Sequence, residues 1–445
     1  MNQPDSAPLL PTDPSAYARL TEKLQALVDT IAPSNLFYQS TLKDAGLLGA
    51  TITPELFCAH MPFTTRDAWV ADQEHRPPYG SNLTFSVDAY TRFSRTSGST
   101  GAPRIWLDTS ASWQSMLENW KQVYDAANIT AHNRLFFAFS FGPFLGFWTA
   151  FDAATQLGGL CVPGGGLSTD ARLSLMADMR IDTLCCTPTY AIHMGQAARA
   201  KGMTCAPKGA DLAVQRIIVA GEPGGCIPAT RSAISKLWGN AHIIDHHGMT
   251  EVGPVTYQPY NHPDNLVVME SAYLAEVIDP ESGTHITPGE TGELVLTTLE
   301  RTGSPLLRYR TGDLVRAQRM PINDNEPSAL FLLGGILGRV DDMVIIRGVN
   351  VFPTAIENIV RAAPHVVEYQ VEINESDAMR DLSIRVEWHT ACPDPAQASE
   401  SLSRDLRDAL ALRIPVQSVP IDTLPRYELK ARRWIRRDDT TGATP

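Results

Sequence analysis

The sequence predicts an α/β protein with a large N-terminal domain, containing mixed or parallel sheets and a small β-rich subdomain, and a small mobile α+β C-terminal domain. Three observations predict this class. Helix-like and strand-like segments alternate in the first part of the chain. From Glu276, short strands with alternating apolar and polar residues are joined by Pro, Gly and Ser turns, and a compact region ends the sequence. A chain of 445 residues is long enough for roughly two or three domains, and we place the main boundary between residues 1–338 and 339–445.

The first predicted elements are an N-terminal helix and a buried aromatic stretch. An amphipathic helix is indicated by the spacing of Leu20, Leu24, Leu27, Val28 and Ile31. Residues 135–151, LFFAFSFGPFLGFWTAF, fall short of the roughly 20 apolar residues that cross a bilayer and are interrupted by glycine and proline. They predict a buried strand that runs through a turn into a packed helix, and their rings would also suit the wall of a pocket for a flat aromatic ligand.

A strand–helix–strand unit follows. Residues 216–219, RIIV, form a β-branched run before a glycine turn, Pro228 opens a helix, and residues 241–245, AHIID, are the next strand. This order predicts a parallel sheet, and ligands of such sheets gather at the carboxyl ends of the strands. The segments GEPGG (221–225) and HHGMTE (246–251) both lie at such ends.

The last predicted elements belong to the C-terminal domain, which at about one hundred residues has a usual domain size. Apolar residues alternate with charged ones in two segments and predict two half-buried strands. The apolar positions are Tyr369, Val371 and Ile373 in the first strand and Leu382, Ile384, Val386 and Trp388 in the second. Residues 401–413, SLSRDLRDALALR, predict a helix after them.

Composition and charge argue against several kinds of partner. A formal net charge of −12 speaks against nucleic acid and against an anionic membrane, because both need a basic footprint on the protein. The seven cysteines are odd in number and include no C-x-x-C pair, which speaks against a disulfide framework or a zinc ribbon. The N-terminus has no basic segment followed by an apolar one, so we expect no secretion signal and a cytoplasmic location.

The stretch SRTSGSTGAPR, residues 94–104, predicts an anion-binding loop. Its hydroxyl side chains compete with the backbone for hydrogen bonds, and Gly98 and Gly101 can adopt positive φ, so neither a helix nor a strand is favoured. Loops with exposed N–H groups and hydroxyls bind anions, although a plain surface turn has the same composition. The segment is no Walker A loop, since that motif needs G-x-x-x-x-G-K-[ST].

Seven motifs together resemble a known family. They are TSGSTGAPR, AGEPGG, HHGMTE, YRTGDL, GRVDD, RGVNVFP and LPRYELKARR, and MPFTT at residues 61–65 adds to them. Their order and spacing from about Pro62 to Arg437 resemble the adenylate-forming superfamily of acyl-CoA ligases, above all its phenylacetate-CoA ligase-like branch. The resemblance implies that a carboxylate attacks the α-phosphate of ATP to give an acyl-adenylate and pyrophosphate. A thiol, usually that of coenzyme A, would then displace AMP and form a thioester.

The resemblance also implies a set of nucleotide-binding residues. The β- and γ-phosphates of ATP would be held by Ser97, Gly98, Ser99, Thr100 and Gly101. Glu251 would help to hold Mg²⁺, and Asp313 would accept both ribose hydroxyls. Adenine and ribose would lie against Gly221, Glu222, Pro223, Asp245, His246, His247 and Arg339. His247 stands where a stacking tyrosine is usual, and Arg104 stands where a lysine is common.

The C-terminal domain would supply the moving parts. Lys430 would bridge the substrate carboxylate and the α-phosphate during adenylation, and Asp341 would be the hinge. The swing would withdraw Lys430 and bring Arg347 and Gly348 toward the thiol of coenzyme A. The arginines around Lys430 are also compatible with a solvated basic helix end, or with contacts to the phosphates of coenzyme A.

The expected substrate is a small aromatic acid. Its pocket would be formed by Phe141, Gly142, Pro143, Ala220, His247, Gly248, Met249 and Thr250. A flat apolar pocket of this kind suits a phenylacetate-, benzoate- or anthranilate-like acid. Tyr190 or His193 could supply one polar partner for a ring substituent.

Three functions stay open at this level. The first is an aryl-CoA ligase that uses ATP, Mg²⁺ and coenzyme A, as a monomer or a homodimer. The second is an enzyme that loads an aryl acid onto a carrier-protein thiol, and the third is an inactive relative that binds nucleotide. A metal site formed by His246 or His247 with Cys226 and His262 is a further alternative, although neighbours on a strand point to opposite faces.

Overall fold

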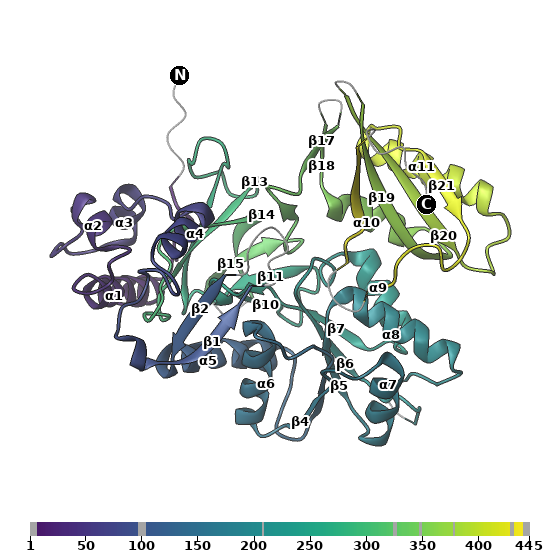
Figure 1. Cartoon of the computed structure of the whole chain (residues 1–445), viewed down its shortest axis with the longest axis horizontal. Coiled ribbons are helices and arrows are strands. Elements are labelled where there is room, and N and C mark those ends of the chain that lie inside the picture. The colour runs from purple at the N-terminus through teal and green to yellow at the C-terminus, as the bar shows by residue number, and fades with distance from the viewer. Residues whose placement is uncertain are drawn as a thin grey trace.

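The computed structural model describes residues 7–96, 104–206, 209–323, 327–346, 349–376, 379–427 and 431–438. It contains a parallel sheet, a larger antiparallel sheet, a group of N-terminal helices and a separate C-terminal α+β region (Figure 1). The predicted α/β class is therefore confirmed.

The parallel sheet has five strands in the order β4-β3-β5-β6-β7. Its strands are β3 (Arg134–Phe137), β4 (Leu160–Pro163), β5 (Thr183–Cys186), β6 (Arg216–Val219) and β7 (His242–Asp245), and the helices between them are α6 (Leu145–Leu157), α7 (Thr169–Asp178), α8 (Pro188–Ala200) and α9 (Pro228–Leu237). Phe137 and Ile218 belong to one hydrophobic core and their neighbours Phe136 and Ile217 to another. Both faces of the sheet are thus buried, as is usual for parallel sheets. The strand–turn–helix predicted for residues 135–151 and the strand–helix–strand unit after it are confirmed.

The antiparallel sheet has seven strands, in the order β10-β11-β15-β14-β13-β12 with β16 paired to β14. They are β10 (Thr256–Tyr257), β11 (Asn265–Val268), β12 (Tyr273–Ile278), β13 (Thr291–Thr298), β14 (Tyr309–Pro321), β15 (Ser328–Leu333) and β16 (Gly338–Arg339). The β-rich region is as expected, but its strands are not all short and alternating, since β14 has 13 residues and every residue of β12 is buried. The reason is that both faces are covered: Val277 joins the core that contains α5 (Ser110–Ala126), and Leu274 joins the core that contains α1 (Pro14–Ile31).

The N-terminal helices and two further strand pairs complete the part of the chain that precedes the C-terminal region. The helices are α1, α2 (Gln39–Asp44), α3 (Pro54–His60) and α4 (Arg66–His75), and the smaller elements are the 3₁₀ turn η1 (Val87–Ala89), the hairpin of β1 (Tyr90–Arg95) and β2 (Ile105–Thr109), and the pair β8 (Gly248–Met249) and β9 (Gly253–Pro254). The predicted amphipathic helix is confirmed as α1, which buries all five of its predicted apolar residues. None of the helices in the described ranges is long and apolar enough to cross a membrane.

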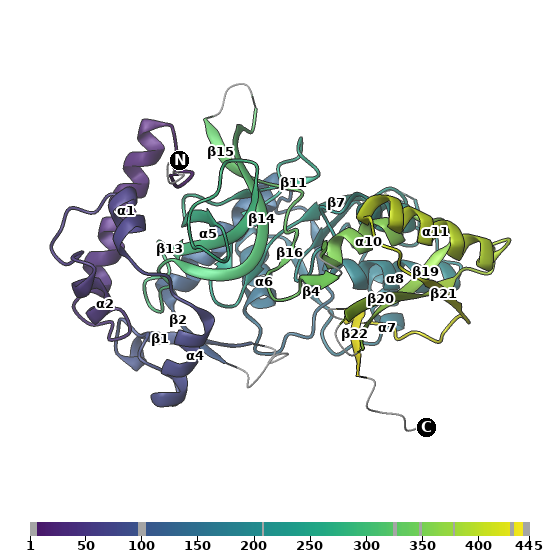
Figure 2. The same cartoon turned by 90° about the horizontal axis from the view of Figure 1, so that it is seen from above.

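The C-terminal region, defined here as residues 344–438, has a hydrophobic core of its own that starts at Val344 and includes Trp434. Its elements are β17 (Val344–Ile346), β18 (Val349–Val351), α10 (Pro353–Ala362), β19 (Val366–Ser376), β20 (Met379–Trp388), α11 (Pro395–Leu410), β21 (Val416–Val419) and β22 (Trp434–Asp438). The two strands and the helix predicted here are confirmed as β19, β20 and α11. Figures 1 and 2 show the region beside α8 and α9 of the parallel sheet. The predicted boundary at residues 338 and 339 stays a prediction.

Candidate active site

The carboxyl end of β7 meets β14 through a histidine and an aspartate. His247 Nε2 lies 3.1 Å from Asp313 Oδ2. The two atoms are not aligned for a hydrogen bond, so among the described residues both are buried polar atoms without a hydrogen-bond partner. Buried polar atoms are costly unless they are paired, so this pair indicates a place where a ligand supplies the missing partners. The sequence predicted both residues at one nucleotide site, and the structure brings them together.

Arg339 connects this aspartate to the predicted hinge. Its Nη1 donates to Asp313 Oδ1 at 2.8 Å, and its Nε donates to Asp341 Oδ1 at 3.1 Å. The backbone of β16 pairs Arg339 directly with Asp313. Gly312 leaves the room that this contact needs, since it has φ +76° and an added Cβ would lie 2.7 Å from an Arg339 guanidinium nitrogen.

The backbone of the turn that carries Thr250 and Glu251 is held by an arginine that the sequence analysis did not predict. Arg301 Nη1 donates to the backbone carbonyls of Thr250 and Glu251, each at 2.8 Å. The same guanidinium makes a buried two-pronged ion pair with Asp108, with distances of 2.6 and 2.7 Å. The one signal in the sequence was an aspartate within the apolar strand IWLDT.

The pKa of the Glu251 carboxyl is affected both by burial and by nearby arginines. Burial raises its pKa above the usual value, and Arg66, Arg339 and Arg301 counteract part of the rise. Because burial disfavours the anion, a nearby cation would stabilise it. The carboxylate oxygens of Glu251 are of the ligand type that Mg²⁺ takes, so the residue fits its predicted role. Tyr309 lies in the same electrostatic cluster, and burial raises its pKa as well.

The residues that flank the predicted phosphate loop belong to, or lie next to, the hairpin of β1 and β2. Thr96 N donates to Arg104 O at 2.9 Å, and Arg104 N donates to Thr96 Oγ1 at 2.9 Å. Residues Ser97, Gly98, Ser99, Thr100 and Gly101 lie outside the described residues. Arg104 pairs with Glu74 at 2.7 Å, and Arg95 N donates to Pro143 O at 2.6 Å. The second contact ties the base of the loop to the predicted substrate pocket.

Asp245 and His246 are held by protein groups. The Asp245 carboxylate accepts from Cys226 N at 2.7 Å and from His246 N at 3.0 Å. The His246 ring lies 4.3 Å from that of Trp120, its Nδ1 is 2.6 Å from Thr256 O, and burial lowers its pKa to about 4. Both residues shape the wall at the end of β7, and their contact with adenine stays a prediction.

The other predicted wall residues, in the loop after β6, divide into backbone and side-chain roles. Ala220 N donates to Cys186 O at 3.2 Å, which ties the start of the loop to β5. Gly221 has φ +94°, a conformation that suits glycine. Pro223 is exposed. Glu222 differs from these neighbours because its side chain contacts the C-terminal region, as described below.

The residues predicted to form the substrate pocket include packed aromatic rings. Phe141, with φ 45°, places its ring 5.4 Å from Phe151 and 5.1 Å from Trp148, and Trp148 Nε1 donates to Gly142 O at 3.0 Å. Met249 packs partly buried against the same core. The rings therefore pack against one another at the residues predicted to form the substrate pocket.

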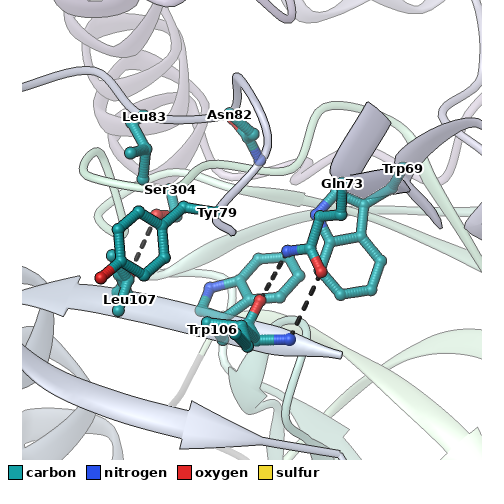
Figure 3. Close-up of a pocket in the computed structure, with 9 residues that line it drawn as sticks. Trp69, Gln73, Tyr79, Asn82, Leu83, Trp106, Leu107 and Ser304 are labelled. Carbon is teal, nitrogen blue, oxygen red and sulfur yellow. Dashed lines mark hydrogen bonds between the residues drawn. The ribbon is translucent and has the colours of Figure 1, made fainter. Parts of the chain in front are cut away.

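A small hollow lies apart from these residues. Figure 3 shows it between α4 and β2, lined by Trp69, Gln73, Tyr79, Asn82, Leu83, Ile105, Trp106, Leu107 and Ser304. Its volume of about 10 Å³ is that of a single water. This volume makes the hollow a water-sized recess and not a substrate pocket. The buried indole Nε1 of Trp106, one of the lining residues, has no hydrogen-bond partner among the described residues.

The C-terminal region contacts the parallel sheet next to the site. Ala431 N donates to Glu222 Oε2 at 2.9 Å, and Arg433 Nη1 donates to Thr189 Oγ1 at 3.2 Å. Lys430, Arg347 and Gly348 lie outside the described residues.

The alternative metal site is not assembled. Cys226 accepts from Gln258 Nε2 at 3.4 Å, and His262 Nε2 is 3.2 Å from Ile322 O. Within the part of the chain that the structure describes, no group of three or more His, Cys, Asp or Glu side chains is placed to hold a metal ion.

Comparison with known proteins shows what the chain is similar to. A family model described as AMP-binding enzyme matches residues 93–299, and one described as AMP-binding enzyme C-terminal domain matches residues 348–437. A phenylacetate-coenzyme A ligase of Thermus thermophilus is 28% identical over 434 residues, covering 92% of this chain and 93% of the relative. The phenylacetate-coenzyme A ligase of Escherichia coli K12 is 29% identical over 374 residues, covering 81% and 82%.

Solved structures share the fold. A 2-hydroxyisobutyryl-CoA ligase in the postadenylation state, in complex with R3-HIB-AMP, matches with a TM-score of 0.87 and 24% identity, covering 98% of this chain and 94% of that one. The same ligase in the thioesterification state, with 2-HIB-AMP and CoA, matches with a TM-score of only 0.69 over the same shares of both chains.

Proposed function

The chain belongs to the AMP-binding enzyme family and is an acid–thiol ligase, and on this premise we propose that it joins a small aromatic carboxylic acid to coenzyme A at the expense of ATP. The observation that carries the proposal is the meeting of His247, Asp313 and Arg339, which come from three separate motifs. Two buried polar atoms there, His247 Nε2 and Asp313 Oδ2, have no hydrogen-bond partner among the described residues. A ribose with two hydroxyl groups would supply them.

The reaction has two steps for a chemical reason. Direct attack of a thiol on a carboxylate would expel oxide, which is a very poor leaving group. The acid oxygen therefore attacks the α-phosphorus of ATP first, and the bond to the β-phosphate oxygen breaks as pyrophosphate leaves. The sulfur of coenzyme A then attacks the acyl carbon, the bond to AMP breaks, and the thiol proton passes to solvent.

The fixed part of the site would orient the nucleotide. Asp313 would accept the ribose hydroxyls while Arg339 holds its other oxygen in place. Glu251, held by Arg301 through its backbone, would contribute to the Mg²⁺ site. That ion would screen the negative charge of the phosphates when bound. The loop of residues 97–101 would hold the β- and γ-phosphates through its hydroxyls and N–H groups.

The moving part of the site would act in turn. Lys430 would stabilise the charge that develops between acid and α-phosphate, and Asp341 would be the pivot that removes it. Arg347 and Gly348 would then approach the thiol. The contact of Ala431 with Glu222 supports the first of these placements, because Ala431 is the neighbour of Lys430 in the chain.

Aromatic acids are favoured by the ring-lined wall around Phe141 and by the relatives named phenylacetate-coenzyme A ligase. A small branched hydroxy acid is the second candidate, because 2-hydroxyisobutyryl-CoA ligase structures share the fold across 98% of this chain. Both belong in one substrate panel. The cytoplasmic location and the homodimer stay predictions, for cell fractionation and light scattering to test.

The test is an assay of acid-dependent pyrophosphate release and of thioester formation, with ATP and Mg²⁺, with and without coenzyme A. Phenylacetate, benzoate, anthranilate, salicylate and 2-hydroxyisobutyrate form the panel. We expect thioester with an aromatic acid and free coenzyme A. Thioester with 2-hydroxyisobutyrate alone would overturn the aromatic assignment, and adenylate trapped by hydroxylamine without thioester would favour a carrier-protein thiol. Absence of pyrophosphate release with every acid would contradict the ligase activity.

A further inference from the structure

The side chain of Glu222 joins the two parts of the molecule. It stands in the loop after β6, where one carboxylate oxygen accepts from Thr189 N at 2.8 Å, in the first turn of α8. The other oxygen accepts from Ala431 N at 2.9 Å, in the C-terminal region. Each oxygen of a single carboxylate therefore has a backbone N–H from a different part of the chain.

The surroundings make this bridge rigid on the side of the parallel sheet. The N-terminus of α8 carries a partial positive charge that favours an anion, so Glu222 is held in place there whether or not the C-terminal region is docked. A hydrogen bond from a backbone N–H to a carboxylate is also stronger than one to a neutral acceptor. Glu222 thus presents a preformed acceptor to Ala431.

The segment around Ala431 is anchored close to the same point. Arg433 reaches Thr189 Oγ1 at 3.2 Å while its Nε donates to Glu368 at 2.8 Å. Tyr427 OH also donates to Arg432 O at 2.7 Å. Thr189 therefore contacts both residues that hold this segment. Its hydroxyl accepts from Arg433, and its backbone N–H donates to the Glu222 carboxylate.

We propose that Glu222 is a positioning residue for the adenylation step, a role that rests on the proposed function. Its carboxylate holds the backbone of Ala431, and thereby sets where the neighbouring Lys430 enters the site. The bridge is a contact between the two parts of the molecule, so the proposed swing of the C-terminal region about Asp341 would break it. Glu222 therefore acts on one half-reaction. A residue that only contacts adenine would act on both, because the acyl-adenylate still carries the adenine.

The test separates the two half-reactions in Glu222→Gln and Glu222→Ala. Glutamine keeps the shape but offers an NH₂ group to one of the two N–H donors, so at least one bridge bond is lost. We expect acid-dependent pyrophosphate release to fall about tenfold or more, the range for a hydrogen bond to a charged group. Thioester formation from supplied acyl-adenylate and coenzyme A should change by less than about threefold, within the range of a minor contact.

Glu290→Gln is the matched control, since Glu290 accepts from the backbone N–H of Thr287 in an exposed turn, and it should leave both half-reactions unchanged. Equal losses in both half-reactions of the Glu222 variants would overturn the proposal in favour of an adenine contact, and so would the absence of loss in both.

A second measurement does not depend on activity. Amide hydrogen exchange of the peptide 427–434, without any ligand, should be faster in Glu222→Gln than in wild type and in Glu290→Gln, at an unchanged melting temperature. Unaltered exchange would overturn the bridge, even if the wild-type protein proved inactive toward every acid. Inactive wild type with faster exchange in the variant would instead count against the proposed function and leave the bridge standing.

Discussion

The structure contains two buried ion networks, one next to Glu251 and one in the C-terminal region. Each pairs an arginine with at least one buried carboxylate, and the two differ in which other parts of the chain the arginine contacts. Arg301 pairs with Asp108, both almost fully buried, and holds the backbone of Thr250 and Glu251. Arg433 pairs with Glu368 at 2.8 Å and lies 3.8 Å from Glu357, both within the C-terminal region. The first network is internal to the fixed site, and the second faces an interface.

The interface itself is held by weaker contacts. Arg433 crosses it only to the neutral hydroxyl of Thr189, and Glu222 crosses it to a backbone N–H. Among the described residues, no ion pair joins the C-terminal region to α8 or α9. Separation of the two surfaces therefore leaves Arg433 paired with Glu368 and Glu357, so it exposes no unpaired buried charge of Arg433. The fixed network would have no such freedom. The following changes test this contrast, from the largest expected effect to the smallest.

Arg301→Leu should destabilise the whole protein. It leaves Asp108 as an uncompensated buried charge, which costs about 3–5 kcal/mol of unfolding free energy. Urea unfolding followed by tryptophan fluorescence measures the loss. Arg433→Leu, by contrast, should destabilise the C-terminal region alone, so that this region unfolds in a separate transition at lower urea concentration. If both variants lost stability in one shared transition, the distinction between a fixed network and an interface network would be wrong.

His246 provides a pH test of the fixed side. Its pKa falls from 6.5 to about 4 through burial, so the folded state binds fewer protons than the unfolded state between these values. Its contribution to stability is complete above pH 6.5 and is lost as the pH falls toward 4, by about 3 kcal/mol in total. As the pH is lowered from 7 to 4.5, the melting temperature should therefore fall less steeply in His246→Phe than in wild type. Parallel curves for the two proteins would refute the assignment.

Thr189→Val should have a small effect confined to adenylation. It removes the hydroxyl that Arg433 reaches and leaves a guanidinium N–H unpaired only while the C-terminal region is docked. A neutral partner of this kind contributes about 1 kcal/mol, so pyrophosphate release should fall about fivefold. Thr189→Ser keeps the hydroxyl and serves as the control. A loss of the same size in thioester formation would show that Thr189 acts on the fixed site instead.

The sequence was sufficient for the elements and for the site residues that belong to motifs. Helical spacing predicted α1, and the order of strand, helix and strand predicted the parallel pairing of β6 and β7. Asp313 and His247 were expected at one nucleotide site, and they lie within 3.1 Å of each other. Local patterns carry this information because each residue belongs to a short sequence motif, HHGMTE for His247 and YRTGDL for Asp313.

The partnerships between distant residues could not be predicted in the same way. Arg301 and Asp108 are 193 positions apart, and neither belongs to a motif. The bridge from Glu222 to Ala431 depends on how the C-terminal region docks against α8, which no local pattern encodes. The alternation expected in β12 failed for a related reason, because a second layer of helices covers the face that would otherwise meet water.

The central claim is that the C-terminal region moves while the rest of the site stays fixed. The most direct test compares the rates of the two half-reactions in Lys430→Ala. Loss of one electrostatic stabiliser costs about 10²–10³ in rate, so acid-dependent pyrophosphate release should fall at least about a hundredfold. Thioester formation from supplied acyl-adenylate and coenzyme A should persist at close to the wild-type rate. Equal loss of both half-reactions would contradict the account.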